Sequence, residues 1–295
     1  MKKSFYEINN IFEYNINGKK NNLNEKIKLL KYMTNNNEFK YKGAENCLLN
    51  DPDSQFCIYH LLAPKKVVGK KRILIGKKGD GSYVLLEDFN EIKIAYSFGI
   101  SNNINFDSEL ARLDIDIYMY DHTIRSLPYN NNKFHWKKIG IRGKNKRHPN
   151  LKTLEELIIE NGHTQQYNML LKLDVENAEW EALHDLSDSI LIQFKYIIIE
   201  FHFENENKTQ LYYEVLKKLH KNHQSFYFRC NGRSTIAIFG NNRICKYIEI
   251  SYVIKKNNAF IKDDSIYPIS EFDYSAKNSN TKKPEMEVNI LTLFD

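Results

Sequence analysis

The chain has 295 residues, of which 42% are hydrophobic and 27% charged, a composition typical of a folded globular protein rather than a fibrous or disordered one. Lys and Arg number 43 against 37 Asp and Glu, so the formal charge of +6 is mild and fits an anionic small substrate at least as well as a nucleic acid. No stretch approaches about 18 consecutive apolar residues, so we expect no membrane span.

The four cysteines, Cys47, Cys57, Cys230 and Cys245, form neither a CxxC pair nor a zinc-type spacing with a nearby histidine. A reducing compartment is therefore expected. The first residues, 1–7, lack the apolar run of a signal peptide. Together these features predict a cytoplasmic protein, although it could act on material destined for the cell surface.

Three regions differ in their sequence pattern. Residues 1–64 are polar and mixed, and apolar residues at helical spacing over 24–34 predict a helix, so we interpret 1–64 as a mainly helical extension. Residues 65–255 carry the strand and helix patterns of one main domain. Residues 256–295 form a polar C-terminal tail with little pattern.

Within the main domain, apolar runs that predict strands alternate with runs that predict helices. The strands are predicted at 72–76, 82–86, 92–96, 115–119, 134–141, 168–175, 194–201, 226–228, 235–239 and 247–254. The helices are predicted at 106–113, 153–160, 176–186 and 209–219. This alternation indicates an α/β fold with a largely parallel sheet and helices on both faces. The pair Asn231–Gly232 favours a hairpin, which would add an antiparallel edge.

The strongest functional signal is a strand–turn–helix–strand unit that ends in an acid. The turn Ser97–Phe98–Gly99 would let a ligand approach the backbone, and Asp121 would accept hydrogen bonds from ribose hydroxyls. The unit therefore predicts a nucleoside ligand. The turn lacks the three-glycine dinucleotide fingerprint, and the chain has no glycine-rich loop ending in Lys-Ser/Thr, which argues against NAD and against a P-loop NTPase. S-adenosylmethionine has a ribose but no pyrophosphate, and it is the favoured ligand.

Several residues of the kind that can do chemistry follow predicted strands, at the edge where ligands bind in such sheets. They are Ser97, Gly99, Asp121, His122, Asp174, Glu176, Glu200 and His202. Glu200 and His202 are two apart, so they share one face of an extended strand. A histidine beside carboxylates can act as a general base near neutral pH. The trio of Asp174, Glu200 and His202 could also hold a hard or borderline metal.

Each of these residues also has a purely structural explanation. Gly99 can be only a turn glycine, and His202 can be a structural histidine. Asp121 and Asp174 can be helix caps or solvated acids, and paired acids at sheet ends are common without a metal.

The strongest basic cluster is the run 142–148, with the sequence RGKNKRH. We interpret it as a solvated loop, with a docking patch for a phosphate or nucleotide diphosphate as the alternative. The run does not interleave aromatic residues, so a nucleic-acid partner is not favoured.

Several segments in a fixed order resemble the S-adenosylmethionine-dependent methyltransferase-domain family that includes animal methyltransferase-like proteins, and the related FkbM-type O-methyltransferases. The segments are 78–85 (KGDGSYVL), 95–100 (AYSFGI), 105–111, 120–123 (YDHT), 172–183 (KLDVENAEWEAL) and 199–202 (IEFH). The resemblance covers about residues 70–250. It implies a Rossmann-like class I methyltransferase fold, with a mostly parallel seven-stranded sheet, helices on both faces and an antiparallel edge hairpin.

The resemblance also implies roles for particular residues. Those expected at S-adenosyl-L-methionine are Asp80, Gly81, Tyr83, Ser97, Phe98, Gly99, Asp121, His122 and Asp174. Two residues depart from the family patterns. Ser97 stands where most methyltransferases have an acid, and Asn177 stands where FkbM-type sequences often have glycine.

The resulting prediction is an O-methyltransferase that acts on a hydroxyl of a sugar or nucleotide-activated sugar used in a surface glycan or capsule polysaccharide. His202, or Asp174 with it, would take the hydroxyl proton, and Glu200 would orient the histidine or join a divalent metal. The alternatives are transfer to a phosphate or phosphoramidate oxygen or to nucleic acid, a non-catalytic nucleoside-binding scaffold, and a hydride-transfer enzyme.

Overall fold

The computed structural model describes residues 58–231, 236–239, 242–265, 267, 269 and 271–272. The helix predicted at 24–34 and most of the predicted extension lie outside these residues.

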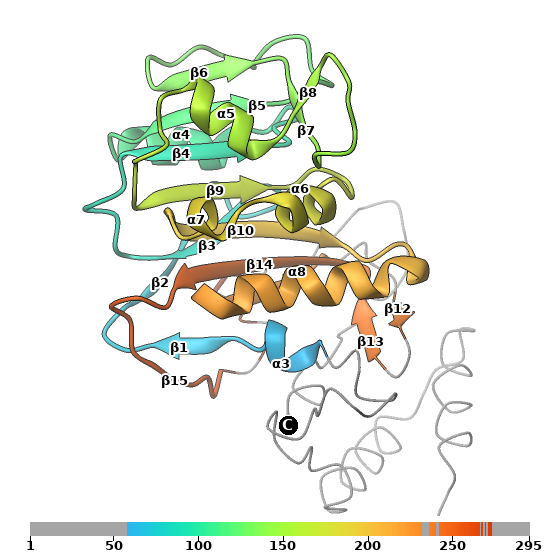
Figure 1. Ribbon diagram of the computed structural model, residues 1–295. Coiled ribbons are helices and arrows are strands. Elements are labelled where there is room, and N and C mark those ends of the chain that lie inside the picture. Colours follow the sequence, from blue (N-terminus) through green and yellow to red (C-terminus); the bar gives the residue numbers. More distant parts are fainter. Residues whose placement is uncertain are drawn as a thin grey trace, which may run out of the picture. The chain divides into compact units, whose positions relative to one another are not determined.

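The central feature is a seven-stranded sheet in the order β11–β14–β10–β9–β4–β5–β6 (Figure 1). Its strands are β4 (Ile94–Phe98), β5 (Asp116–Tyr120), β6 (Phe134–Lys137), β9 (Met169–Leu173), β10 (Phe194–His202), β11 (His223–Cys230) and β14 (Tyr247–Ile254). Only β14 in this sheet runs against the others. The predicted α/β fold with a mostly parallel seven-stranded sheet is confirmed.

Helices cover both faces of the sheet. They are α3 (Tyr59–Leu62), α4 (Asn105–Arg112), α5 (Leu154–Glu160), α6 (Glu179–Asp185), α7 (Asp188–Leu191) and α8 (Thr209–Asn222), with a 3₁₀ turn, η3 (Glu206–Lys208). In Figure 1, α5, α6 and α8 lie in front of the sheet and α4 lies behind it. None of the helices in the described part of the chain is both long and apolar enough to cross a membrane.

Local sequence signals explain where these helices begin and what they bury. Thr153 accepts from the Glu156 N–H, and the Glu156 side chain accepts from the Thr153 N–H, so α5 begins with the predicted cap. Helix α8 buries Tyr212, Val215 and Leu216 at helical spacing. Every residue of β9 is buried, because helices cover this strand on both sides.

The sheet ends in an antiparallel pair, β11 and β14, as predicted, but the hairpin around Asn231–Gly232 that was expected to form it does not do so. The strand after Asn231–Gly232, β12 (Ile236–Phe239), pairs with β13 (Asn242–Cys245) rather than with β11. Strand β14 lies between β10 and β11, one position in from the edge. The six central residues of β14 are all buried. This burial on both faces fits a position inside the sheet, which the turn signal at Asn231–Gly232 did not indicate.

Two smaller corrections concern short strands. The single strand predicted at 134–141 ends at Lys137, and a separate β7 (Gly140–Ile141) pairs with β8 (Leu151–Lys152). Within the predicted polar tail, β15 (Phe260–Lys262) pairs with β1 (Lys65–Val67). The predicted pair of strands at 72–76 and 82–86 is confirmed as β2 (Arg72–Ile75) and β3 (Tyr83–Leu86).

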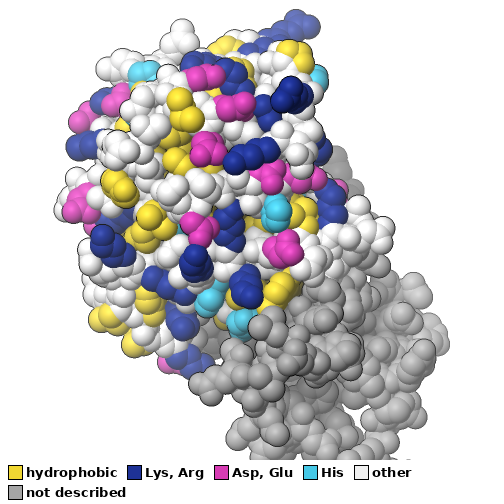
Figure 2. All heavy atoms as spheres, viewed as in Figure 1, with side chains coloured by type: hydrophobic (Ala, Val, Ile, Leu, Met, Phe, Trp, Pro, Cys, Tyr) yellow, Lys and Arg dark blue, Asp and Glu magenta, His cyan; other side chains and the backbone are white. Residues whose placement is uncertain are grey.

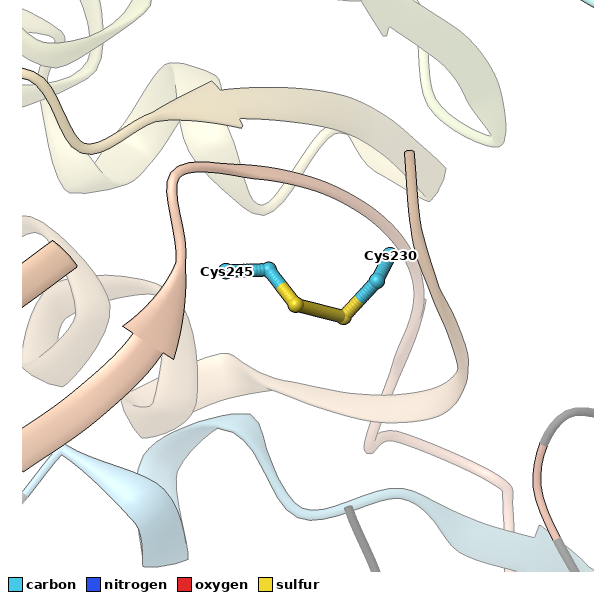
Figure 3. Close-up of a disulfide and its surroundings, with 2 residues drawn as sticks. All are labelled: Cys230 and Cys245. Carbon is cyan, nitrogen blue, oxygen red and sulfur yellow. A yellow bond between two sulfur atoms is a disulfide. The ribbon is translucent and has the colours of Figure 1, made fainter. Parts of the chain in front are cut away.

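A disulfide joins Cys230, at the end of β11, to Cys245, at the end of β13 (Figure 3). The two cysteines are 15 positions apart and match no short cysteine motif, so only the fold brings them together. A reducing compartment was expected because the sequence shows no cysteine motif. The disulfide between Cys230 and Cys245 means that the cysteines no longer support that expectation.

The buried His223 makes the stability of the fold sensitive to acid. Its Nε2 donates to the Phe194 carbonyl at 2.9 Å, and burial lowers its pKa to about 4, with Lys255 acting in the same direction. Because the unfolded chain takes up this proton at a pKa of about 6.5, stability is present above that pH and is lost as the pH falls towards 4.

We therefore expect the free energy of unfolding to drop by up to about 3 kcal/mol between pH 7 and pH 4 through this residue. Urea denaturation across that range measures the drop. In His223→Gln, which cannot titrate, the pH slope should become shallower by that amount. An identical slope in both proteins would contradict the assignment.

Candidate functional site

The predicted site residues converge at the carboxyl edge of the sheet. Gly99 directly follows β4 and Asp174 directly follows β9, and these strands are neighbours in the sheet. Glu200 and His202 lie at the end of β10, the next strand along. Asp121 follows β5, on the other side of β4. The parallel arrangement thus brings one group of acids and a histidine beside the candidate cofactor turn.

The turn at Gly99 leaves no room for a side chain. Gly99 has φ +76°, and a Cβ there would lie 1.6 Å from the Asp174 carbonyl oxygen. The Asp174 N–H donates to the Phe98 carbonyl at 3.3 Å, so the ends of β4 and β9 are joined at this point. Any ligand that contacts the turn therefore lies within reach of the residues that follow β9.

A buried lysine that the sequence analysis did not single out holds this turn. Lys172 Nζ donates to the carbonyl oxygens of Phe98 and Gly99, at 3.1 and 2.6 Å. Asp107 of α4 lies beside Lys172 and Ser97, and burial raises the pKa of Asp107 although both neighbours oppose that rise. A carboxyl group from α4 thus lies next to Ser97, the position where most methyltransferases have an acid.

Asp121 lies where it was predicted, but its carboxylate binds the turn itself. Oδ2 accepts from the N–H groups of Ile100 and Ser101, both at 2.9 Å, and Oδ1 accepts from the N–H and the hydroxyl of Thr123. Burial would raise the pKa of Asp121, but these hydrogen bonds outweigh it and lower the pKa. Each oxygen already accepts two hydrogen bonds, so a ribose hydroxyl would have to replace one of them.

His122, the other residue predicted after β5, points towards β7. A Cβ built on Gly140 would lie 2.4 Å from His122 Nδ1, so the imidazole packs on that glycine. The structure therefore separates His122 from the group formed by Asp174, Glu200 and His202.

The predicted Asp80–Tyr83 signature borders the turn. Asn103 Nδ2 donates to the Asp80 carbonyl at 2.6 Å, and it lies where a side chain on Gly81, at φ +75°, would have to be. The buried Tyr83 donates its hydroxyl to Asp174 Oδ2 at 3.0 Å. Burial and the nearby acids, Asp174 first, hold the Tyr83 pKa well above its usual value, so the hydroxyl stays a donor. The Asp80 side chain is itself exposed.

Asp174, Glu200 and His202 form the predicted cluster. One ligand-type atom from each lies within 4.8 Å of the others, so these three side chains could hold a metal ion. Burial and the Asp174 carboxylate raise the pKa of Glu200 to about 9. Burial opposes ionisation of Asp174, but Lys172 and hydrogen bonds from its neighbours lower its pKa. At neutral pH, Glu200 is therefore the protonated member of the pair and Asp174 the ionised one.

The acids around His202 raise its pKa to about 9, although burial acts against this. Glu179 accepts from His202 Nδ1 at 3.1 Å, and Glu176 Oε2 lies 3.4 Å from Nε2. Glu200 was predicted to orient the histidine or to join a metal. In the structure Glu200 accepts from Asn231 Nδ2 at 2.9 Å, and the acid that accepts from the imidazole is Glu179, so of the two roles the geometry leaves Glu200 the metal-ligand one as a prediction. Glu179 was missed because its place in the chain suggested only the interior of a helix.

A family model for the methyltransferase FkbM domain matches residues 46–229, more than half of the chain. The chain belongs to the FkbM methyltransferase family. No curated protein matches it. A solved structure described as a "putative rRNA-methylase" from Clostridium thermocellum is 12% identical over 55% of this chain and 86% of that chain, with a TM-score of 0.30, and so distant a likeness carries no argument.

The family assignment confirms the resemblance seen in the sequence motifs and fits the observed strand order. The chain is thus a methyltransferase-domain protein with a Rossmann-like sheet. The roles of individual residues in binding and catalysis stay predictions.

The basic run of this FkbM protein is largely paired with acids. Arg142 Nη2 lies 2.9 Å from Glu156, Lys144 lies 3.3 Å from Glu155, and Lys146 lies 2.9 Å from Glu181. Figure 2 shows basic and acidic side chains interspersed over this face rather than one basic patch. A hollow of about 290 Å³ here is lined by both kinds of charge. The pairing favours a solvated loop over a phosphate-docking patch.

Proposed function

We propose that this FkbM-family protein is an S-adenosylmethionine-dependent O-methyltransferase for a sugar or nucleotide-activated sugar of a surface glycan or capsule. The observation that carries the proposal is the contact between Gly99 of the candidate cofactor turn and Asp174 of the acid–histidine cluster. A methyl donor at the turn and a hydroxyl at the cluster would then be neighbours. The sugar acceptor rests on the resemblance to FkbM-type enzymes.

The side chains around the turn suit a positively charged cofactor. Asp174 is ionised and the Asp121 carboxylate binds the turn, so these two acids outnumber the buried Lys172 that donates to the turn carbonyls. S-adenosylmethionine supplies a methyl group on a sulfonium, which an oxygen attacks in line. The chain's own contribution is to hold the acceptor oxygen in that line and to exclude water, which can supply about 7–11 kcal/mol of the barrier reduction.

Proton removal from the acceptor falls to Asp174 and His202. Asp174 is already ionised at neutral pH, and Tyr83 fixes one of its oxygens by a 3.0 Å hydrogen bond. At neutral pH the His202 ring is an imidazolium, with a proton on both nitrogens. It can therefore act as a base only after losing one of those protons. A cationic ligand at the turn disfavours a second positive charge nearby, and we expect it to lower the His202 pKa.

A divalent cation is a second candidate occupant of the cluster. Two carboxyl groups and an imidazole are donors that manganese or zinc accepts in proteins. If the cation takes part in the transfer, EDTA removes activity and Mn²⁺ restores it. Full turnover in EDTA would assign the cluster to proton transfer alone.

The proposal is tested with purified full-length protein, S-adenosylmethionine labelled in its methyl group and a pool of nucleotide-activated sugars. We expect label on a sugar hydroxyl, located by fragmentation mass spectrometry. Label on RNA instead, with binding that weakens steeply as salt rises, would support the nucleic-acid alternative. Tight cofactor binding without transfer to any acceptor would support a non-catalytic scaffold.

A further inference from the structure

Glu179 is a buried acid whose carboxylate contacts one residue of the site. It is the first residue of α6, and its side chain is 0% exposed. Its Oε1 accepts from the His202 backbone N–H at 2.9 Å and from the imidazole Nδ1 at 3.1 Å. Both contacts come from the same residue of the neighbouring strand, β10. A carboxylate buried this deeply is costly unless its partners are well placed.

The next residue of α6 holds the same histidine from its other side. Trp180 Nε1 donates to the His202 carbonyl at 2.8 Å, and the indole stacks on Phe201 with ring centroids 4.4 Å apart. The start of α6 thus fixes the backbone N–H, the backbone carbonyl and the ring of His202. Strand β10 is already paired with β14 as far as His202, so the contact of Glu179 with the ring is not needed to hold the strand.

The opposite ring nitrogen of His202 lies beside an exposed acid, although the His202 side chain itself is only 3% exposed. Nε2 lies 3.4 Å from Glu176 Oε2, and the Glu176 side chain is 85% exposed. Nδ1 is therefore turned towards the buried Glu179 and Nε2 towards the exposed Glu176. A buried acid on one nitrogen fixes the orientation of a functional imidazole and keeps the other nitrogen for a ligand or a proton.

We infer that Glu179 is a positioning residue for methyl transfer, which holds the His202 ring so that Nε2 faces the acceptor. This inference rests on the proposed function, because it takes His202 to be the group that meets the acceptor. Glu200, which the sequence suggested for this role, bonds Asn231 instead.

The test compares Glu179→Ala and Glu179→Gln in the full-length protein. Glutamine keeps an oxygen that can accept from Nδ1, whereas alanine removes it. We expect Glu179→Ala to lower kcat by about 10–100-fold, as loss of an outer-shell partner typically does, and Glu179→Gln to recover part of that loss. The KM for S-adenosylmethionine should change by less than about threefold, because the turn at Gly99 is not touched.

Glu181→Gln is the matched control. Glu181 lies on the same helix but pairs with Lys146 and Lys208, each at 2.9 Å, so kcat should stay unchanged. A second readout is the imidazole ¹⁵N signal of His202, identified by its loss in His202→Gln. It should shift in both Glu179 variants and stay in place in the control.

Two results would overturn the inference: an unshifted His202 signal in Glu179→Ala, or full kcat in Glu179→Ala while His202→Gln is inactive. A failure of the proposed function looks different. In that case the wild-type protein transfers no labelled methyl group to any sugar, whereas the ¹⁵N signal in the Glu179 variants still shows whether Glu179 orients the ring.

Discussion

Asp174→Asn should lower the turnover number by about 10²–10⁴-fold, the usual contribution of a positioned general base. Asp174 is the ionised acid of the cluster, and its Oδ2 lies 3.0 Å from the Tyr83 hydroxyl and 3.7 Å from Lys172 Nζ. Asparagine keeps the shape of the side chain and can still accept from Tyr83, but it cannot take a proton at neutral pH. Single-turnover transfer of the labelled methyl group measures this loss directly.

Asp188→Asn is the control for removing one acid from this protein. Asp188 begins α7 and pairs with Lys221 at 2.6 Å on the surface, so its loss should leave turnover unchanged. Calorimetry with S-adenosylmethionine separates binding from chemistry in the Asp174 variant. Full turnover in Asp174→Asn with an acceptor that wild type methylates would show that Asp174 is not the base.

The convergence of Asp174, Glu200 and His202 was predictable because it follows from one geometric rule. Each ends a strongly apolar strand, and parallel strands bring their carboxyl ends to one edge. The order of strands along that edge was harder to predict. The turn signal at Asn231–Gly232 suggested a hairpin, but burial on both faces places β14 between β10 and β11.

Residues that act from inside regular elements were not predictable in the same way. Lys172 lies within an apolar strand, and Glu179, which begins α6, lies inside the helix predicted at 176–186, so neither differs in pattern from a residue that only packs. Asp121 shows the opposite case. Its position at the end of a strand was predicted, but the four hydrogen bonds that hold its carboxylate against the turn come from backbone geometry that no spacing reveals.

The close approach of Gly99 to Asp174 brings the cofactor turn and the cluster together, and a single added Cβ atom on Gly99 would disrupt it. Gly99→Ala should lower the free energy of unfolding by more than about 4 kcal/mol. So large a loss from one substitution is exceptional, and here it combines a steric clash with a strained backbone conformation. The left-handed conformation at φ +76° costs alanine about 1–2 kcal/mol by itself. The larger part comes from the Cβ, which would lie 1.6 Å from the Asp174 carbonyl oxygen, a backbone atom.

Gly69→Ala isolates the conformational part of this cost. Gly69 has nearly the same backbone angle, φ +74°, but nothing lies within 4 Å of a Cβ there. Urea denaturation should therefore give a loss of about 1–2 kcal/mol for Gly69→Ala and a much larger one for Gly99→Ala. If Gly99→Ala folds at all, the ends of β4 and β9 must move apart, and the protein should no longer bind S-adenosylmethionine. Equal losses in the two variants, with binding intact, would mean that the turn and the cluster are not held together as described.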